Sequence, residues 1–222
     1  MSHQENAPLS VVPGAIRFNT DSMKLEYYRG GPVGFGTTTQ TGEWVNLTTD
    51  SPDIQTGGAR GLFGGAGVST NTIDYITIST TGNAIDFGDL LTSRQNPASC
   101  SSSTRGLFSG GYSGSGRTNL IDYITISSTG NAQDFGDLTA AKLGLGSLAS
   151  QTRGIVAGGR TPSILNVIDY VTIASTGNAQ DFGDLTLARF NLSGCASSTR
   201  GIFASGAAPS TVNVIDFITI ST

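Results

Sequence analysis

One stretch of this sequence occurs almost unchanged three times, and it constrains the fold more than any other feature. The copy at residues 121–138 reads IDYITISSTGNAQDFGDL, and the other two lie at 73–90 and 168–185. Its first half returns at residues 215–222, so the copies recur at intervals of 47 or 48 residues. A period in this range indicates a solenoid, a propeller or another array of structural repeats.

An Arg-Gly-aliphatic sequence opens each repeat and sets the boundaries of the predicted units. These units cover residues 60–104, 105–152, 153–199 and a half unit at 200–222. Each full unit contains four pieces of strand length, which in the second unit are 105–111, 121–127, 132–138 and 143–150. The second and third pieces are joined by a Thr-Gly-Asn turn, because Gly and Asn tolerate positive φ. Four antiparallel strands, the first ending in a glycine pair, are typical of a propeller blade.

The composition favours an all-β fold. Charged residues make up only 13% of the chain, about half of the usual share, and Gly, Ser and Thr interspersed with Val, Ile, Tyr and Phe suit short strands and tight turns. The second strand of a unit is apolar on both faces, with Ile121 and Tyr123 on one and Ile124 and Ile126 on the other. We therefore predict a propeller-like array of four-stranded sheets that pack against one another.

Three full units and a half unit raise the question of how the array ends. Propellers usually close with about four to eight blades, and an open array leaves a bare strand edge. We predict that the two ends of the chain close a four-bladed ring, with residues 43–59 supplying the missing outer strands. The alternative is that the open end meets another subunit.

Residues 13–49 follow a flexible lead at 1–12 and form a predicted β-hairpin module, separate from the repeats at 50–222. Apolar and polar residues alternate here as they do in the strands of a small sheet, in three segments: Gly14-x-Ile-Arg-Phe-Asn, Leu25-Glu-Tyr-Tyr and Gly42-Glu-Trp-Val-Asn-Leu. This sequence resembles a short β module of bacteriophage tail fibres. The modules of that family are usually trimers wound around a threefold axis. The loop at 31–41 is longer than the turn of that family. A small β-meander packed on the next domain is the alternative.

The repeats carry two further resemblances. Their period and glycine pair resemble Kelch-type blades, although the Tyr and Trp of a standard Kelch repeat are missing. Their sequence, for example NVIDYVTIASTGNAQDFGDLT, resembles that of repeats in tail-fibre-like proteins of phages, and of cyanophages especially.

Together the resemblances imply a non-enzymatic virion protein of a bacteriophage, made in the host cytoplasm. Its expected place is the tail fibre or tail tip, where it contributes to attachment to a host-surface glycan. The expected partners are other virion proteins, reached through residues 13–49, and further copies of the chain, with a trimer favoured. One alternative is a capsid head-decoration or head-fibre protein without a receptor role, and another is a carbohydrate-active enzyme on a propeller.

The charges and the rare residue types exclude several functions. A net charge of −4 with scattered Lys and Arg gives no basic face, so no nucleic-acid partner is expected. The first residues lack a signal-peptide pattern, and no apolar run approaches the ~20 residues that cross a bilayer, so we expect no membrane insertion. Since the only histidine is His3, a Ser-His-Asp arrangement and a zinc site are not expected. We predict no catalytic residues, no metal and no cofactor.

Two sets of aspartates recur at fixed positions. The pairs Asp86/Asp89, Asp134/Asp137 and Asp181/Asp184 indicate turn capping, with calcium ligation and glycoside hydrolysis by two carboxylates as alternatives. A buried aspartate in an apolar strand needs a partner, and the second set occupies such positions: Asp74, Asp122, Asp169 and Asp216. We predict that their partners are the arginines that open the units, which are Arg60, Arg105, Arg153 and Arg200.

The loops between the first and second strands differ among the units, and in a propeller they share one face. Because loops on a rigid scaffold often carry binding residues, we name Tyr112, Arg117 and Arg160 as candidate ligand-binding residues, suited to stacking on a sugar or contacting an anion. The alternative is solvated loop decoration. Cys100 and Cys195 are equivalent to Leu148, which indicates an apolar packing site, with a disulfide as the minor alternative.

Overall fold

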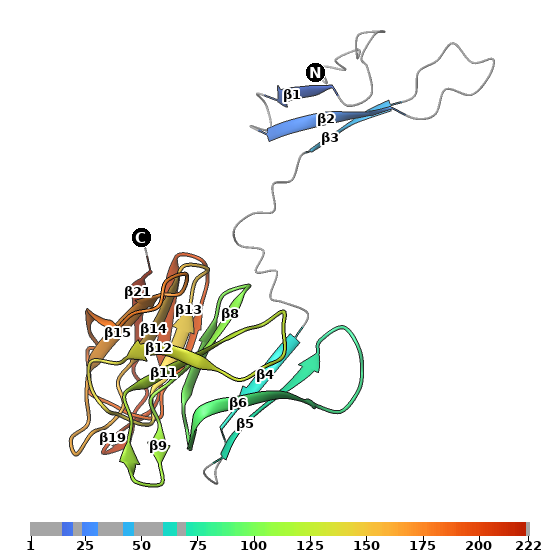
Figure 1. Cartoon of the computed structure of the whole chain (residues 1–222). Coiled ribbons are helices and arrows are strands. Elements are labelled where there is room, and N and C mark those ends of the chain that lie inside the picture. Colours follow the sequence, from blue (N-terminus) through green and yellow to red (C-terminus); the bar gives the residue numbers. More distant parts are fainter. Residues whose placement is uncertain (1–14, 20–23, 31–41, 47–59, 66–69, 221–222) are drawn as a thin grey trace, which may run out of the picture. The chain divides into compact units, whose positions relative to one another are not determined.

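The computed structural model describes residues 15–19, 24–30, 42–46, 60–65 and 70–220 (Figure 1). The chain divides into two compact units, Met1–Ser51 and Pro52–Thr222. Every regular element in the described ranges is a β-strand, which confirms the all-β prediction. These ranges therefore contain no helix that could cross a membrane. The lead predicted at 1–12 and the loop at 31–41 lie outside the described residues.

The first unit contains a three-stranded antiparallel sheet of β1 (Ile16–Asn19), β2 (Lys24–Gly30) and β3 (Gly42–Asn46). One face of this sheet is held together around Trp44. The Arg17 guanidinium lies 4.3 Å from the Trp44 ring centroid, and Arg17 Nε lies 2.8 Å from Glu26 Oε2. The Tyr28 ring packs edge-on against Trp44 with 5.4 Å between centroids.

The alternate positions of β1 and β2 point to the opposite face, because successive side chains of a strand alternate. Phe18 pairs with Leu25, and Ile16 pairs with Tyr27. The side chains of Ile16, Phe18 and Leu25 are exposed. This face of the small sheet is therefore an apolar surface.

The described part of the second unit contains four antiparallel sheets of three or four strands, which follow one another along the chain (Figure 1). The first is made of β4 (Arg60–Gly64), β5 (Thr70–Thr77) and β6 (Ile85–Arg94). The second is made of β7 (Ala98–Ser101), β8 (Arg105–Ser109), β11 (Leu120–Thr125) and β12 (Gln133–Asp137). The third is made of β13 (Gly146–Ala149), β14 (Arg153–Ala157), β15 (Val167–Thr172) and β16 (Gln180–Asp184). The fourth is made of β17 (Ser193–Ala196), β18 (Arg200–Ala204) and β21 (Ile215–Thr219).

Two short hairpins extend from connections between strands of these sheets. In the second sheet, the connection from β8 to β11 contains β9 (Tyr112–Ser113) and β10 (Gly116–Arg117). In the fourth sheet, the connection from β18 to β21 contains β19 (Ala207–Ala208) and β20 (Ser210–Thr211).

The sheets are offset by one strand from the predicted units. The piece at 143–150, predicted as the last strand of the second unit, contains β13, and β13 pairs with β14 of the third sheet. The reason is the length of the connections, because residues 150–152 form a tight link between β13 and β14, whereas residues 138–145 separate β12 from β13. A short link favours antiparallel pairing of the strands it joins.

Both faces of the inner sheets are buried, and the sheets at the two ends show which neighbour covers which face. Ile121 and Ile168 are each 1% exposed, whereas Ile215 at the same position of the last sheet is 69% exposed. On the other face, Phe108 is 3% exposed, whereas Phe63 at the same position of the first sheet is 59% exposed. One face of each inner sheet is thus covered by the next sheet and the other face by the preceding sheet.

Three apolar clusters lie between successive sheets. Ile73 of the first sheet packs with Phe108 of the second, Leu107 of the second packs with Val156 of the third, and Ile155 of the third packs with Phe203 of the fourth. The core is therefore a series of interfaces between sheets. This is the arrangement expected for stacked repeats, each of which contacts only its neighbours.

The predicted closure of a ring by the two ends of the chain is not observed. Residues 42–46 form β3 and pair with β2 in the first unit, so they supply no outer strand to the repeats, and residues 47–59 lie outside the described ranges. The face of the first sheet at Phe63 and the face of the last sheet at Ile215 are both exposed. The described sheets therefore form an open array.

Candidate functional site

Tyr112 and Arg117 lie opposite each other in the β9–β10 hairpin, and both are exposed. The base of the hairpin is fixed by two hydrogen bonds between Tyr112 and Gln95, in which each backbone amide donates to the other carbonyl at 2.8 and 2.9 Å. Ser113 Oγ donates to the carbonyl of Gly116 at 3.1 Å and tightens the tip. The sequence prediction thus selected two residues that the structure brings together on one exposed loop.

Arg160 lies on the equivalent connection of the third sheet. Its guanidinium stacks over the ring of Phe190 at 4.8 Å from the centroid, and its backbone bridges to Leu143 and Ile164. Among the described residues, no hydrogen bond, ion pair or ring contact joins Arg160 to Tyr112 or Arg117. The three candidate residues therefore occupy two separate loops.

A buried ion pair joins each sheet to the next. Arg94 Nη2 at the end of β6 lies 2.6 Å from Asp122 Oδ2 on β11. Lys142 Nζ lies 3.0 Å from Asp169 Oδ2, and Arg189 Nη1 lies 2.8 Å from Asp216 Oδ2. All three cations are fully buried. The cation always comes from the preceding repeat and the aspartate from the following one.

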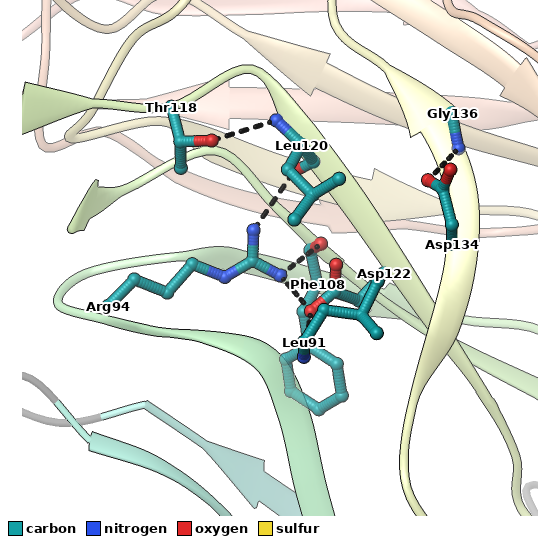
Figure 2. Close-up of polar contacts among 8 residues, drawn as sticks. All are labelled: Leu91, Arg94, Phe108, Thr118, Leu120, Asp122, Asp134 and Gly136. Carbon is teal, nitrogen blue, oxygen red and sulfur yellow. Dashed lines mark hydrogen bonds and ion pairs between the residues drawn. The ribbon is translucent and has the colours of Figure 1, made fainter.

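Further hydrogen bonds hold the charged groups of the first pair in place (Figure 2). Arg94 Nη1 donates to the carbonyl of Leu120 at 3.0 Å, and Arg94 Nη2 donates to that of Phe108 at 3.2 Å. The amide of Leu91 donates to Asp122 Oδ2 at 3.1 Å. Buried charges are tolerated only with such compensation, because removal from water is costly.

The surroundings shift the pKa values of Asp122, Arg94 and Asp216. Burial raises the pKa of the Asp122 carboxyl, and the charge of Arg94 and the amide of Leu91 oppose that rise. It also lowers the pKa of the Arg94 guanidinium against the attraction of Asp122, because a dry environment disfavours charge. At Asp216 burial acts in the same sense, but the hydrogen bonds from Thr186 and Arg189 outweigh it and leave the pKa below its ordinary value.

Glycine pairs follow β8 and β14, and they contact the backbone from which a buried cation projects. In the second sheet, Gly111 donates to the carbonyl of Lys142 at 3.0 Å. Gly110 has a φ of +61°, and a Cβ there would lie 2.7 Å from the same carbonyl. Only glycine accommodates both the left-handed backbone and this close approach. The glycines that indicated a blade in the sequence thus help to position Lys142.

The partners predicted for the buried aspartates were wrong. The arginines that open the units stack on aromatic rings of their own sheets, as Arg105 does on Tyr123 at 4.8 Å from the centroid. Arg105 Nη1 also donates to the carbonyl of Ile173 in the next sheet at 2.8 Å. The true partners, Arg94, Lys142 and Arg189, carry a signal in the sequence, because each lies five residues after the second aspartate of an Asp-Phe-Gly-Asp segment.

The first aspartate of each Asp-Phe-Gly-Asp segment accepts the backbone amide two residues further on, at a β-bulge within its strand and not at a turn. Local capping of the backbone is thus observed for the first aspartate of each pair. Asp134 Oδ1 accepts the amide of Gly136 at 3.1 Å (Figure 2), and Asp86 and Asp181 accept the amides of Gly88 and Gly183 in the same way. The described residues contain no group of three or more His, Cys, Asp or Glu side chains placed to hold a metal ion.

Cys100 and Cys195 are free thiols in equivalent positions of β7 and β17. Cys100 packs against the apolar cluster between the second and third sheets, and burial raises the pKa of its thiol to about 12. Cys195 is exposed. The packing interpretation is confirmed for Cys100 and wrong for Cys195, which lies in the last sheet, where no following sheet covers it among the described residues.

No protein-family model matches the chain, and no curated protein matches it either.

Proposed function

We propose that this chain is a structural protein of a bacteriophage virion, of the tail-fibre or tail-tip type, that contributes to attachment to a glycan of the host surface. The proposal rests on the resemblance of residues 13–48 and of the repeats to such proteins. It is supported by one observation in particular, the exposed pairing of Tyr112 and Arg117 on a hairpin of a rigid sheet. An aromatic ring beside a guanidinium suits a sugar that carries an anionic group.

We further propose that the four sheets are blades of a propeller-like array. Each blade presents its connection from the first to the second long strand at the same end of the sheet, because the topology repeats. The buried ion pairs between sheets keep these connections in fixed relative positions. Variable loops on such a scaffold give specificity without disturbing the core.

The small sheet of the first unit is proposed as the attachment and oligomerisation module. Its apolar face of Ile16, Phe18 and Leu25 is the kind of surface that a protein partner or a second copy covers. A homotrimer and contacts with other virion proteins are the expected assemblies.

A binding assay on host polysaccharide tests the attachment role. We expect the purified chain to bind it, and Tyr112→Ala and Arg117→Ala to weaken binding at least about tenfold, as for residues at the centre of an interface. Ser210→Ala, on the exposed hairpin of the fourth sheet, is the matched control and should bind normally. Unchanged binding in both loop variants would remove these residues from the site.

A cryo-EM map of the virion tests the location. Density for this chain on the tail would support the proposal, and density on the capsid would support the alternative of a head-decoration protein. Release of reducing sugar from the polysaccharide would instead favour the enzyme alternative.

A further inference from the structure

Two pockets with the same lining lie beside the connection from β11 to β12 and the connection from β15 to β16. Their volumes are about 150 and 210 Å³. The lining residues occupy the same repeat positions, from Tyr123 to Gln133 in one pocket and from Tyr170 to Gln180 in the other. The two linings differ only where Ile124 of the first is replaced by Val171 in the second. We call them the turn pockets.

Two side-chain amides of each turn pocket are held by their oxygen atoms. Asn131 Oδ1 accepts the backbone amide of Asp89 in the preceding sheet at 3.1 Å. Gln133 Oε1 accepts the hydroxyl of Tyr123 at 2.5 Å. The same two hydrogen bonds recur in the third repeat at 3.1 and 2.5 Å. An amide whose oxygen is engaged in this way presents its NH₂ group as a donor.

These donors and the neighbouring hydroxyls have no partner in the part of the chain that the structure describes. Asn131 Nδ2 and Gln133 Nε2 donate no hydrogen bond there, and the side-chain hydroxyls of Thr125, Ser128 and Thr129 make none either. All five residues are exposed. No charged side chain lines either pocket. Each turn pocket therefore offers a fixed, uncharged set of hydrogen-bonding groups to a ligand.

The first repeat shows that the Tyr-Gln hydrogen bond is not needed to build the sheet. Ile85 pairs with Tyr75 there, at the position where Gln133 pairs with Tyr123. The Tyr75 ring still packs edge-on against Phe87 with 5.9 Å between centroids, as the equivalent rings do in the other two repeats. The glutamine is thus present only in the repeats that have a turn pocket among the described residues.

We propose that the two turn pockets are binding sites for a neutral sugar, with one ring in each. Amide and hydroxyl groups bind the hydroxyl and ring oxygens of a sugar, whereas an acidic group favours a charged partner, which these linings lack. Both volumes are below the ~300–1,000 Å³ of pockets for drug-sized ligands, which suits a single ring of a longer glycan. The choice of a sugar rests on the attachment function proposed above, and its neutral class follows from the lining.

The turn pockets form a second kind of site, separate from Tyr112 and Arg117. Those two residues lie in the connection from β8 to β11, and the guanidinium of Arg117 suits an anionic group. A polysaccharide presents the same ring many times, so a molecule that engages both turn pockets gains avidity over one that engages a single pocket.

Titration of the isotopically labelled full chain with small sugars, followed by two-dimensional NMR, tests the proposal. The neutral probes are maltotriose, mannotriose and chitotriose, and trigalacturonate is the acidic comparison. We expect at least one neutral trisaccharide to shift the backbone amide signals of residues 128–133 and 175–180 saturably. Signals of residues 80–85 in the first repeat should stay unchanged. The absence of saturable shifts with all three neutral probes, or shifts with trigalacturonate alone, would overturn the proposal.

Gln133→Ile and Gln180→Ile are the decisive variants, because isoleucine is the residue that the first repeat carries at this position. Each should weaken trisaccharide binding about two- to tenfold at its own pocket, the effect of one lost hydrogen bond, and leave the other pocket unchanged. Tyr112→Ala is the control and should leave both pockets unchanged. Equal affinity of the wild-type chain and both glutamine variants would overturn the proposal.

The same variants separate this inference from the attachment role. Host-polysaccharide binding that persists in the Gln133→Ile/Gln180→Ile double variant, without trisaccharide shifts in the wild-type chain, would overturn the turn pockets and leave the attachment role in place. Trisaccharide shifts at both pockets in a chain that binds no host polysaccharide would support the turn pockets and contradict the attachment role.

Discussion

The guanidinium of Arg94 lies 2.6 Å from the carboxylate of Asp122, and the two residues belong to successive sheets. The pair is fully buried and recurs as Lys142 with Asp169 and as Arg189 with Asp216. Arg94 also donates to the carbonyls of Leu120 and Phe108 in the second sheet. Arg189 likewise contacts Asp216 and the carbonyl of Phe203 in the fourth sheet. Each of these two arginines therefore links its own repeat to the following sheet at more than one point.

Asp122→Ala should destabilise the second unit, because it leaves Arg94 Nη2 and the amide of Leu91 buried without the side-chain oxygen that accepts from both. A buried donor left without its acceptor typically costs about 1–3 kcal/mol. Urea denaturation followed by circular dichroism measures the change. The double substitution Arg94→Met with Asp122→Leu should recover a large part of the loss, since no buried charge remains.

Asp74→Ala provides the matched control for Asp122→Ala. Asp74 occupies the same repeat position in the first sheet, is half-buried and has no hydrogen bond or ion pair through its carboxylate among the described residues. Its replacement should change the free energy of unfolding by less than about 1 kcal/mol. Similar losses in the two variants would show that the carboxylate acts within its own sheet and not between sheets.

Gly136→Ala and Gly183→Ala should differ in stability although their backbones are alike. The φ values are +142° and +138°, so the conformational strain of an added Cβ is shared. At Gly136 the Cβ would lie 2.5 Å from the carbonyl oxygen of Gly177, whereas at Gly183 it would meet nothing within 4 Å. Overpacking of this kind costs about 1–3 kcal/mol, and thermal denaturation should show Gly136→Ala as the less stable variant. Equal melting temperatures would show that the loss of stability comes entirely from the strained backbone conformation and not from the contact with Gly177.

The repeated sequence was sufficient to predict strands, turns and burial of both sheet faces. Ile121 and Ile124 lie on opposite faces of β11 and are both buried, as the uninterrupted apolar pattern indicated. The pattern of apolar and polar residues predicts local structure and burial well, because both depend on the residues of one strand. The pattern did not assign β13 to the correct sheet, since the pairing of β13 depends on the lengths of the two connections that flank it.

The sequence also predicted that the buried aspartates need cations, but not which cations. Arg60 and its equivalents were chosen because they recur as arginine in every repeat, and they stack on aromatic rings instead, as Arg60 does on Tyr75. The true partner is an arginine at Arg94 but a lysine at Lys142, and it lies in the preceding repeat. A search for one residue type that recurs in every repeat therefore does not find it. The pairing depends on how two sheets stack, which periodicity does not determine. The loop residue Arg160 was likewise grouped with Tyr112 on the basis of topology, and the structure leaves it on a separate loop.

Thiol labelling should separate the two cysteines. At pH 8 a maleimide or disulfide reagent should modify the exposed Cys195 rapidly and Cys100 at least about a hundredfold more slowly, because a thiol pKa of about 12 leaves little thiolate. In urea both should react at similar rates. Cys195→Ser is the control and should remove the fast phase alone. A fast phase that persists in this variant would contradict the packing of Cys100 between sheets.

Acidification should change the contributions of Asp216 and Asp122 to stability in opposite directions, although the two aspartates occupy the same repeat position. The pKa of Asp216 is below its ordinary value of 3.8, so the folded state binds fewer protons there than the unfolded chain. Its contribution to stability is complete above the unfolded value and is lost as the pH falls through the folded value. The stability of the wild-type chain relative to Asp216→Asn should therefore be constant above about pH 5 and decrease below about pH 4. Melting temperatures between pH 7 and pH 3, the usual range for such a scan, measure it.

Asp122 supplies the internal control for this experiment, because burial raises its pKa. A raised carboxyl pKa destabilises the fold above the folded value, and protonation relieves that cost as the pH falls. The stability of the wild-type chain relative to Asp122→Asn should therefore increase on acidification, in the opposite sense to the comparison with Asp216→Asn. The two pKa values shift in opposite directions because burial competes with stabilising contacts at each site. At Asp216 the hydrogen bonds from Thr186 and Arg189 outweigh burial, whereas at Asp122 burial outweighs the attraction of Arg94. A common trend in the two comparisons would contradict this difference between the two inter-sheet ion pairs.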